Sequence, residues 1–160
     1  MQKITPCLWF DNQAEEAVKF YTSIFKNSKI TNVTRYSEAG PGVPGSVMVI
    51  NFQLEGLDFI ALNGGPVFHF TEAISLSVDC ESQAEVDKLW EKLTEGGEES
   101  QCGWLKDRYG LSWQIVPREF IELMSDEDPI KVQRVTEAMF QMKKLDVAKA
   151  RQAYEGALVA

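Results

Sequence analysis

The stretch at 102–117, CGWLKDRYGLSWQIVP, holds the densest group of side chains that could do chemistry: two tryptophans, an Asp–Arg pair and the amide of Gln114. The single histidine, His69, could act as a general base because imidazole titrates near neutral pH, although a lone linker histidine is more often a surface residue. Ser75 and Ser77 alternate along one strand pattern and could orient a ligand through hydrogen bonds. Neither serine has an evident His–Asp partner, so the sequence does not indicate a nucleophilic triad.

The 102–117 stretch is predicted to be a β-hairpin. A turn centred on residues 108–109 places Trp104 opposite Trp113, and Gly103 opposite Gln114. Opposed residues of an antiparallel pair share a face, so the two tryptophans are expected to stack on the helix-covered side. Gln114 would then point to the other side, with open space beside the glycine. The Asp–Arg pair is interpreted as part of the turn.

The elements that must position these residues follow one order twice: strand, helix and three strands. The expected strands are 4–10, 30–37 and two around Glu55–Gly56, then 73–80, further strand material and the hairpin. The first helix is expected to follow a cap at Asp11 or Asn12, and the second a capping box at 82–85. Their apolar stripes are 17, 20, 21 and 24, and 86, 89, 90 and 93.

The relation between the two halves decides which strand residues share a face. The helical stripes give an offset of 69 residues, whereas the Gln-Ala-Glu match at 13 and 83 gives 70. A slip of one residue turns every strand side chain to the other face. We favour 69, because burying a stripe outweighs a helix cap. The inward faces are then predicted to be Ile4, Pro6, Leu8 and Phe10; Leu57, Phe59, Ala61 and Asn63; Ala73, Ser75, Ser77 and Asp79; and Ser112, Gln114 and Val116.

The composition limits the class of protein. The chain has 160 residues and a net charge of −8, with no cluster of Lys and Arg that would indicate nucleic-acid binding. No apolar run is long enough to span a membrane, and three cysteines without a CxxC spacing favour a reduced, cytoplasmic setting. We expect one domain with modules at 1–66 and 72–117 and a helical tail at 118–160. Asp128–Pro129 and Asp146 are expected to begin helices in the tail, which would cover its own domain or form a dimer interface.

Several stretches carry a resemblance to a known family. They are AEEAVKFYTSIF, NGGP, VDCESQAEVDKLW, CGWLKDRYGLSWQIVP and AMFQMKKLD, in this order along the chain. The chain resembles the PhnB-like family of the vicinal oxygen chelate superfamily, which includes glyoxalase I, extradiol dioxygenases and bleomycin-resistance proteins. The resemblance implies an α+β fold of tandem βαβββ modules that form a curved mixed sheet around a cavity. It also implies a homodimer.

In metal-dependent members of that superfamily, four inward positions hold the metal ligands. The resemblance places these positions at Ile4, Ala61, Ala73 and Gln114, of which only the last has a ligating atom. Divalent metals in proteins need about three ligands, usually imidazole or carboxylate. We therefore expect no metal and no cofactor.

The function expected from these residues is metal-independent binding of a small molecule, with Phe59, Asn63, Ser75, Ser77 and Gln114 as ligand-binding residues. Two alternatives stay open: a metal-dependent glyoxalase- or dioxygenase-like enzyme with an unidentified site, and a dimeric structural or partner-binding protein with a filled cavity. Some relatives carry a demethylubiquinone methyltransferase label. The sequence does not support it, because NGGP leads into a linker and not into the Gly-rich strand–turn–helix that S-adenosylmethionine usually needs.

Overall fold

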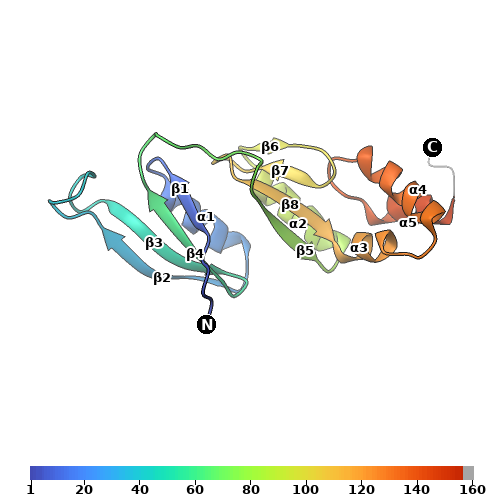
Figure 1. The fold of residues 1–160 in the computed structure, drawn as a ribbon, viewed down its shortest axis with the longest axis horizontal. Helices are drawn as coiled ribbons and strands as arrows, with labels where there is room; N and C mark the ends of the chain where they lie inside the picture. The colour runs from blue at the N-terminus through green and yellow to red at the C-terminus, as the bar shows by residue number, and fades with distance from the viewer. Residues whose placement is uncertain (157–160) are drawn as a thin grey trace. The chain divides into compact units, whose positions relative to one another are not determined.

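The structure of the protein is a computed structural model in which residues 1–156 are described. It has the α+β architecture and the doubled βαβββ order that the sequence predicts, followed by a helical tail (Figure 1). The chain divides into two compact units, Met1–Phe70 and Thr71–Ala160. Each unit has its own four-stranded mixed sheet. A cavity shared by the two modules stays a prediction.

The first unit consists of β1 (Cys7–Phe10), α1 (Ala14–Ile24), β2 (Ser28–Arg35), β3 (Val47–Leu54) and β4 (Leu57–Asn63). Its strands lie in the order β1-β4-β3-β2, with β1 and β4 parallel and the other pairs antiparallel. Helix α1 buries most of the expected stripe, together with Ala14 and Val18, while Phe20 is half-buried. The predicted cap at Asp11 or Asn12 is wrong, because neither side chain forms a capping hydrogen bond with α1. The N–H of Ala14 is instead bound by Asn63 Oδ1, at 2.9 Å.

The predicted orientation of the first sheet is wrong. Strand pairing puts Leu8, Phe10, Phe59, Ala61 and Asn63 on one face, together with Ile50 and Phe52 of β3. This is the face that packs against α1, and its apolar side chains are buried. The opposite face carries Cys7, Trp9, Ile60 and Leu62, which are partly or fully exposed within the unit. The side chains expected to face a cavity therefore form the core under the helix.

The error comes from one residue in the strand–helix connection. Strand β1 ends at Phe10 and α1 begins at Ala14, whereas β5 ends at Cys80 and α2 begins at Gln83. The connection is one residue shorter in the second half, so the helices match at an offset of 69 and the strands at 70. The fully buried thiol of Cys80 therefore takes the place that Phe10 has in the first unit.

The second unit repeats the module with β5 (Ser75–Cys80), α2 (Gln83–Thr94), β6 (Glu98–Glu99), β7 (Trp104–Lys106) and β8 (Ser112–Pro117). Its strands lie in the order β5-β8-β7-β6, with β5 and β8 parallel. The expected stripe of α2 is buried, which confirms that part of the sequence analysis. Ser82 caps this helix as predicted by accepting from the N–H of Glu85; the Glu85 carboxylate in turn accepts from the N–H of Glu81.

The predicted pairing of the hairpin is also wrong. Trp104 lies opposite Gln114, and Leu105 lies opposite Trp113. The strands are joined by a five-residue loop, 107–111, instead of a turn centred on 108–109. Trp113 is therefore buried against the α2 side with Leu105, while Trp104 shares the opposite face with Gln114.

We call the face of the second sheet that points away from α2 the open face. It carries Ser75, Ser77 and Asp79 of β5, Ser112, Gln114 and Val116 of β8, and Trp104 and Lys106 of β7. The residues of β5 and β8 that were predicted to share one face do so, except that Ala73 lies before β5; that this face lines a cavity shared by the modules stays a prediction. For β7 the prediction was wrong: it turned Trp104 and Lys106 to the other face.

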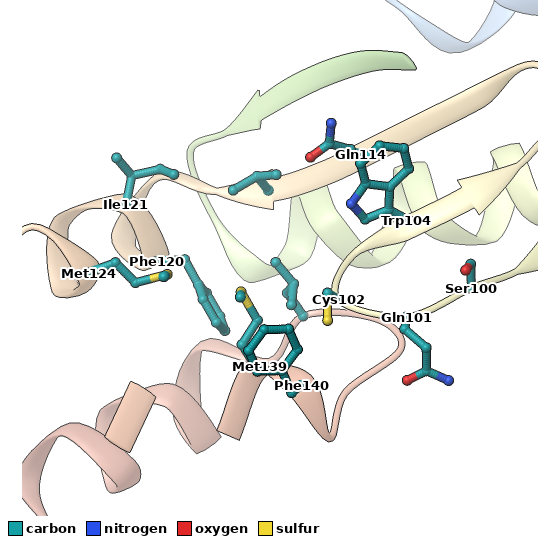
Figure 2. Close-up of a pocket in the computed structure, with 12 residues that line it drawn as sticks. Ser100, Gln101, Cys102, Trp104, Gln114, Phe120, Ile121, Met124, Met139 and Phe140 are labelled. Carbon is teal, nitrogen blue, oxygen red and sulfur yellow. The ribbon is translucent and has the colours of Figure 1, made fainter. Parts of the chain in front are cut away.

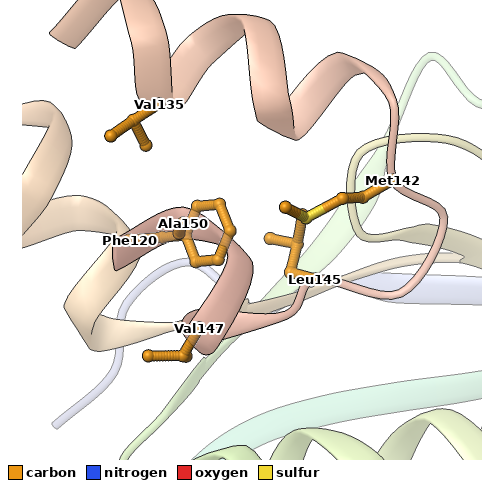
Figure 3. Packing of buried hydrophobic residues seen from close by; sticks show 6 residues of the cluster. All are labelled: Phe120, Val135, Met142, Leu145, Val147 and Ala150. Carbon is orange, nitrogen blue, oxygen red and sulfur yellow. The ribbon is translucent and has the colours of Figure 1, made fainter. Parts of the chain in front are cut away.

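The tail forms α3 (Arg118–Met124), α4 (Pro129–Phe140) and α5 (Val147–Glu155). Asp128 and Asp146 cap α4 and α5, and Pro129 follows its cap at the first helical position, all as predicted. The three helices bury a cluster of their own, shown in Figure 3: Phe120, Val135, Met142, Leu145, Val147 and Ala150. Within residues 1–156, no helix has both the length and the apolar character that crossing a membrane requires.

The tail is attached to the second unit through the loop before β7. The N–H groups of Cys102 and Gly103 donate to the carbonyls of Met142 and Lys143, both at 2.8 Å. A side chain on Gly103 would meet Leu145 at 3.0 Å, and its φ of +84° favours glycine. The space expected beside Gln114 at this glycine is therefore taken by the tail. The tail covers its own unit, as one of the two hypotheses held; its part in a dimer interface stays a prediction.

Candidate functional site

A cleft of about 530 Å3 lies between the open face of the second sheet and the tail (Figure 2). Helices α3 and α4 supply one side of it. The residues along its walls are Trp104, Val116, Phe120, Ile121, Met124, Met139, Phe140 and Leu145, with the Cys102 thiol and the polar Ser100 and Gln101 at one end. A cavity of this size and apolar lining is typical of small-molecule sites.

Gln114 is the polar group on the sheet side of the cleft. Its Nε2 donates to Ser75 Oγ at 2.9 Å, so the amide is held in one orientation and its oxygen stays available as an acceptor towards a ligand. Ser77 is exposed and lies opposite Gln114 on the neighbouring strand. The structure thus brings three of the five predicted ligand-binding residues together on the open face. Contact with a ligand stays a prediction for each of them.

Trp104 and the methionines decide the chemical character of the cleft. The indole of Trp104 lies beside Gln114 on the open face, half-buried, and Figure 2 shows Met124 and Met139 on the helices opposite. Methionine side chains adapt to irregular apolar shapes and pack well against aromatic rings. The cleft therefore suits a largely apolar, flat molecule that can accept or donate one hydrogen bond. Sequence analysis missed Trp104 because of the wrong hairpin register, and it had no signal for the helical wall.

The other two predicted ligand-binding residues lie in the first unit and have structural contacts there. Phe59 is buried and stacks on Phe52, with ring centroids 5.4 Å apart. Both amide atoms of Asn63 are engaged, Oδ1 with the N–H of Ala14 and Nδ2 with the carbonyl of Val47. Asn63 also borders a separate hollow of about 500 Å3 beside Arg35 in the first unit.

The remaining titratable candidates are not gathered in the cleft. His69 is exposed in the segment between β4 and β5. The carboxylate of Asp79 accepts two hydrogen bonds from Arg118, at 2.7 and 3.1 Å, and this ion pair joins the end of β5 to α3. Burial, with the nearby carboxylates of Glu85 and Asp79, raises the pKa of Cys80 to about 12, so this thiol stays protonated and unreactive at neutral pH.

Comparison with known proteins decides the family. The 3-demethylubiquinone-9 3-methyltransferase family matches residues 2–116. A PhnB protein from Bacillus cereus, also described as a 3-demethylubiquinone-9 3-methyltransferase, is 41% identical, with a TM-score of 0.68 over 72% of this chain and 99% of its own. The chain belongs to this PhnB-like family. Its membership in the vicinal oxygen chelate superfamily, expected from the resemblance, is thereby confirmed.

Two more distant structures share the fold of the PhnB-like chain. A protein from Pseudomonas aeruginosa is 20% identical, with a TM-score of 0.61 over 73% of this chain and 98% of its own. A fosfomycin resistance protein from Listeria monocytogenes, complexed with Mn(II) and sulfate ion, is 16% identical, with a TM-score of 0.53 over 72% of this chain and 92% of its own. No curated protein matches. The family match ends before α3, so the tail that forms one wall of the cleft lies outside it.

The residues of this PhnB-like chain do not fit the metal that the superfamily implies. Across residues 1–156, no three side chains of His, Cys, Asp and Glu gather closely enough to hold an ion. Of the four positions that the resemblance gave for metal ligands, Ile4 and Ala73 are exposed, Ala61 is buried in the first core, and none of the three has a ligating side-chain atom. The amide of Gln114 is bound to Ser75.

Addition of Mn(II) or Zn(II) is expected to leave the thermal stability of the protein unchanged. A metal at 100 times its dissociation constant would stabilise the folded state by about 2.7 kcal/mol, which a thermal shift measurement detects easily. The control is the same titration with Mg(II), which should give the same flat response. A saturable rise in melting temperature with one transition metal, at one ion per chain, would show that the protein does hold a metal site.

Proposed function

We propose that this protein binds a small, largely apolar molecule in the cleft of its second unit, without a metal. The observation that carries the proposal is the cleft itself, about 530 Å3 in volume, with Gln114 as an oriented hydrogen-bonding group among aromatic, aliphatic and methionine side chains. Of the predicted ligand-binding residues, Gln114 would contact the ligand and Ser75 would hold its amide in place. Trp104 would supply an aromatic surface.

The activity in the family's name finds no support in the contacts of this chain. A common S-adenosylmethionine site needs a Gly-rich turn between a strand and a helix, where the helix N-terminus and the turn receive the cofactor. After β4, Gly64 and Gly65 lead into a segment that contains neither helix nor strand before β5. Calorimetric titration with S-adenosylmethionine should give no heat of binding; saturable binding would reverse this conclusion.

A bulky substitution on the floor of the cleft tests the proposal. The probe is 1-naphthylmethanol, which has an apolar bicyclic body and one hydroxyl. For wild-type protein we expect a dissociation constant on the order of 0.3 mM by calorimetry, or about 0.4 kcal/mol per non-hydrogen atom. Val116→Trp should weaken binding at least about tenfold, because the indole fills space that the probe needs.

Leu62→Trp is the matched control, since Leu62 holds the position in β4 that Val116 holds in β8, on a half-exposed sheet face. It should leave probe binding within about twofold. Near-UV circular dichroism and melting temperature check that both variants fold. Loss of binding in Leu62→Trp with normal binding in Val116→Trp would place the ligand outside the cleft and overturn the proposal.

We also propose a homodimer, as the family resemblance implies. Light scattering of the purified protein measures its mass directly. A mass of twice 18.1 kDa supports this expectation, and a mass of 18.1 kDa removes it.

A further inference from the structure

We infer that a small pocket beside the cleft receives a protonated amine, so that the ligand is an apolar molecule with a primary ammonium group at one end. This inference rests on the proposed function, because the cleft would hold the apolar body. The pocket has a volume of about 130 Å3 and lies over the β6–β7–β8 part of the second sheet. Trp104 and Ser100 line both the pocket and the cleft, so the two hollows are neighbours.

Ser112 provides a hydroxyl that has no partner within the chain. Its side chain is fully buried and lines the pocket, and Oγ forms no hydrogen bond with any of the described residues. The residue lies on the open face, opposite Ser75 on one side and Lys106 on the other. A buried hydroxyl without a partner is costly, so a bound group that donates or accepts a hydrogen bond here is favoured.

The charges around the pocket select a cation. Glu72 and Glu98 both line it with Lys106, which lies opposite Glu98 in the sheet. The Lys106 ammonium forms an ion pair with Glu72, so two carboxylates share one ammonium and one negative charge remains. A third carboxylate, Glu99, accepts from Nε1 of Trp90 at 2.7 Å. A carboxylate or phosphate group would meet repulsion here, whereas an ammonium group would complete the charge balance.

The contacts of Lys106 exclude a role for Ser112 as a nucleophile. A serine beside a lysine acts as a nucleophile when the lysine is neutral and accepts the hydroxyl proton. The hydrogen bond that Lys106 donates to the Glu72 carboxylate, with the charges of Glu72 and Glu98, raises the pKa of Lys106 and keeps it protonated. Ser112 therefore lacks a base and serves as a hydrogen-bonding group. The aromatic face of Trp104 adds cation–π attraction for an ammonium between the cleft and the pocket.

Three naphthyl compounds of similar size test the inference on the full chain by calorimetry at pH 7. They are 1-naphthylmethylamine, which is cationic, 1-naphthylmethanol, which is neutral, and 1-naphthoate, which is anionic. The amine should bind about tenfold more tightly than the alcohol, because one charge-assisted hydrogen bond in a partly buried site has about that effect. The carboxylate should bind more weakly than the alcohol.

Glu98→Gln should lower the affinity for the amine by about fivefold and leave the affinity for the alcohol within about twofold. Ser112→Ala should lower the affinity for the amine in the same way. Glu91→Gln, which removes an exposed carboxylate from α2, is the control and should change neither affinity. The Glu98→Gln chain keeps every apolar wall of the cleft, so its folding is not at risk.

Equal affinity of the wild-type protein for amine and alcohol would overturn the inference and leave the proposed function intact; the pocket would then hold only water. An equal loss of affinity for both compounds in Glu98→Gln would also overturn it. If none of the three compounds binds, the proposed function fails and the inference fails with it.

Discussion

Removal of the tail after Pro117 is expected to abolish binding of 1-naphthylmethanol, with a loss of at least about a hundredfold in affinity. The wall of the cleft that the tail supplies includes Phe120, Met124, Met139 and Leu145, and all of them lie in the removed segment. Without this wall, Trp104 and Val116 would face solvent, and the probe would lose the apolar contacts that drive its binding.

The shortened chain should still fold. The family match ends at residue 116, and the Bacillus cereus protein is covered over 99% of its length by 72% of this chain. Far-UV circular dichroism and cooperative thermal unfolding check this. If the shortened chain is insoluble, Met139→Lys in the full chain serves instead, because an apolar probe bound beside a charged side chain would cost desolvation of that charge. Met139 also packs against the tail core, so the melting temperature of this variant is measured alongside its affinity. Wild-type affinity in either variant would contradict the role of the tail.

Asp107→Ala should lower the free energy of unfolding of the second unit by about 3 kcal/mol. Asp107 is only 3% exposed and organises the loop between β7 and β8. Its Oδ1 accepts from the N–H groups of Tyr109 and Leu111 at 2.8 and 3.1 Å, and its Oδ2 accepts from Nε1 of the buried Trp113 at 2.9 Å. Alanine removes the carboxylate that accepts from these three donors.

Urea denaturation followed by tryptophan fluorescence measures the effect. Asp107→Asn should lower the free energy of unfolding by less than Asp107→Ala does, because the amide keeps one of the two acceptor oxygens. Asp146→Ala removes an ordinary helix cap and should cost about 1 kcal/mol, which makes it a matched control. A loss of no more than this in Asp107→Ala would mean that Asp107 is merely a turn residue, as its sequence context suggests.

The helices and their order were predictable because their signals are local. The stripe of α2 follows the helical period, and Ser82, Asp128 and Asp146 each cap a helix through a side chain that sequence alone identifies. The order of strand and helix patterns gave the doubled module, and the resemblance of several stretches gave the family. These features required no knowledge of how distant segments pack.

The orientation of the first sheet and the register of the hairpin were not predictable for physical reasons. In β1 the sequence CLWF is apolar on both faces, so alternation sets no phase, and the one-residue difference in the following connection misled the comparison of the halves. In the hairpin, the buried contacts of the Asp107 carboxylate fix a five-residue loop. An Asp three residues before a Gly is typical of many turns, so the sequence does not reveal these contacts.

The candidate site was predictable only in part. Ser75, Ser77 and Gln114 were placed on the open face from the alternation of β5 and β8, and the structure has them there. The helical wall depends on how the tail packs, through the contacts of residues 142 and 143 with the loop before β7, and no local pattern encodes these contacts. Trp104 became a candidate only once the register of the hairpin was known.

The most direct test of the account is a crystal structure of the protein soaked with 1-naphthylmethanol. We expect electron density for the bicyclic ring between β8 and helices α3 and α4, with its hydroxyl within hydrogen-bond distance of the Gln114 amide. A ring bound anywhere else, or an ion held by three or more side chains on the open face, would contradict a metal-independent site in this cleft.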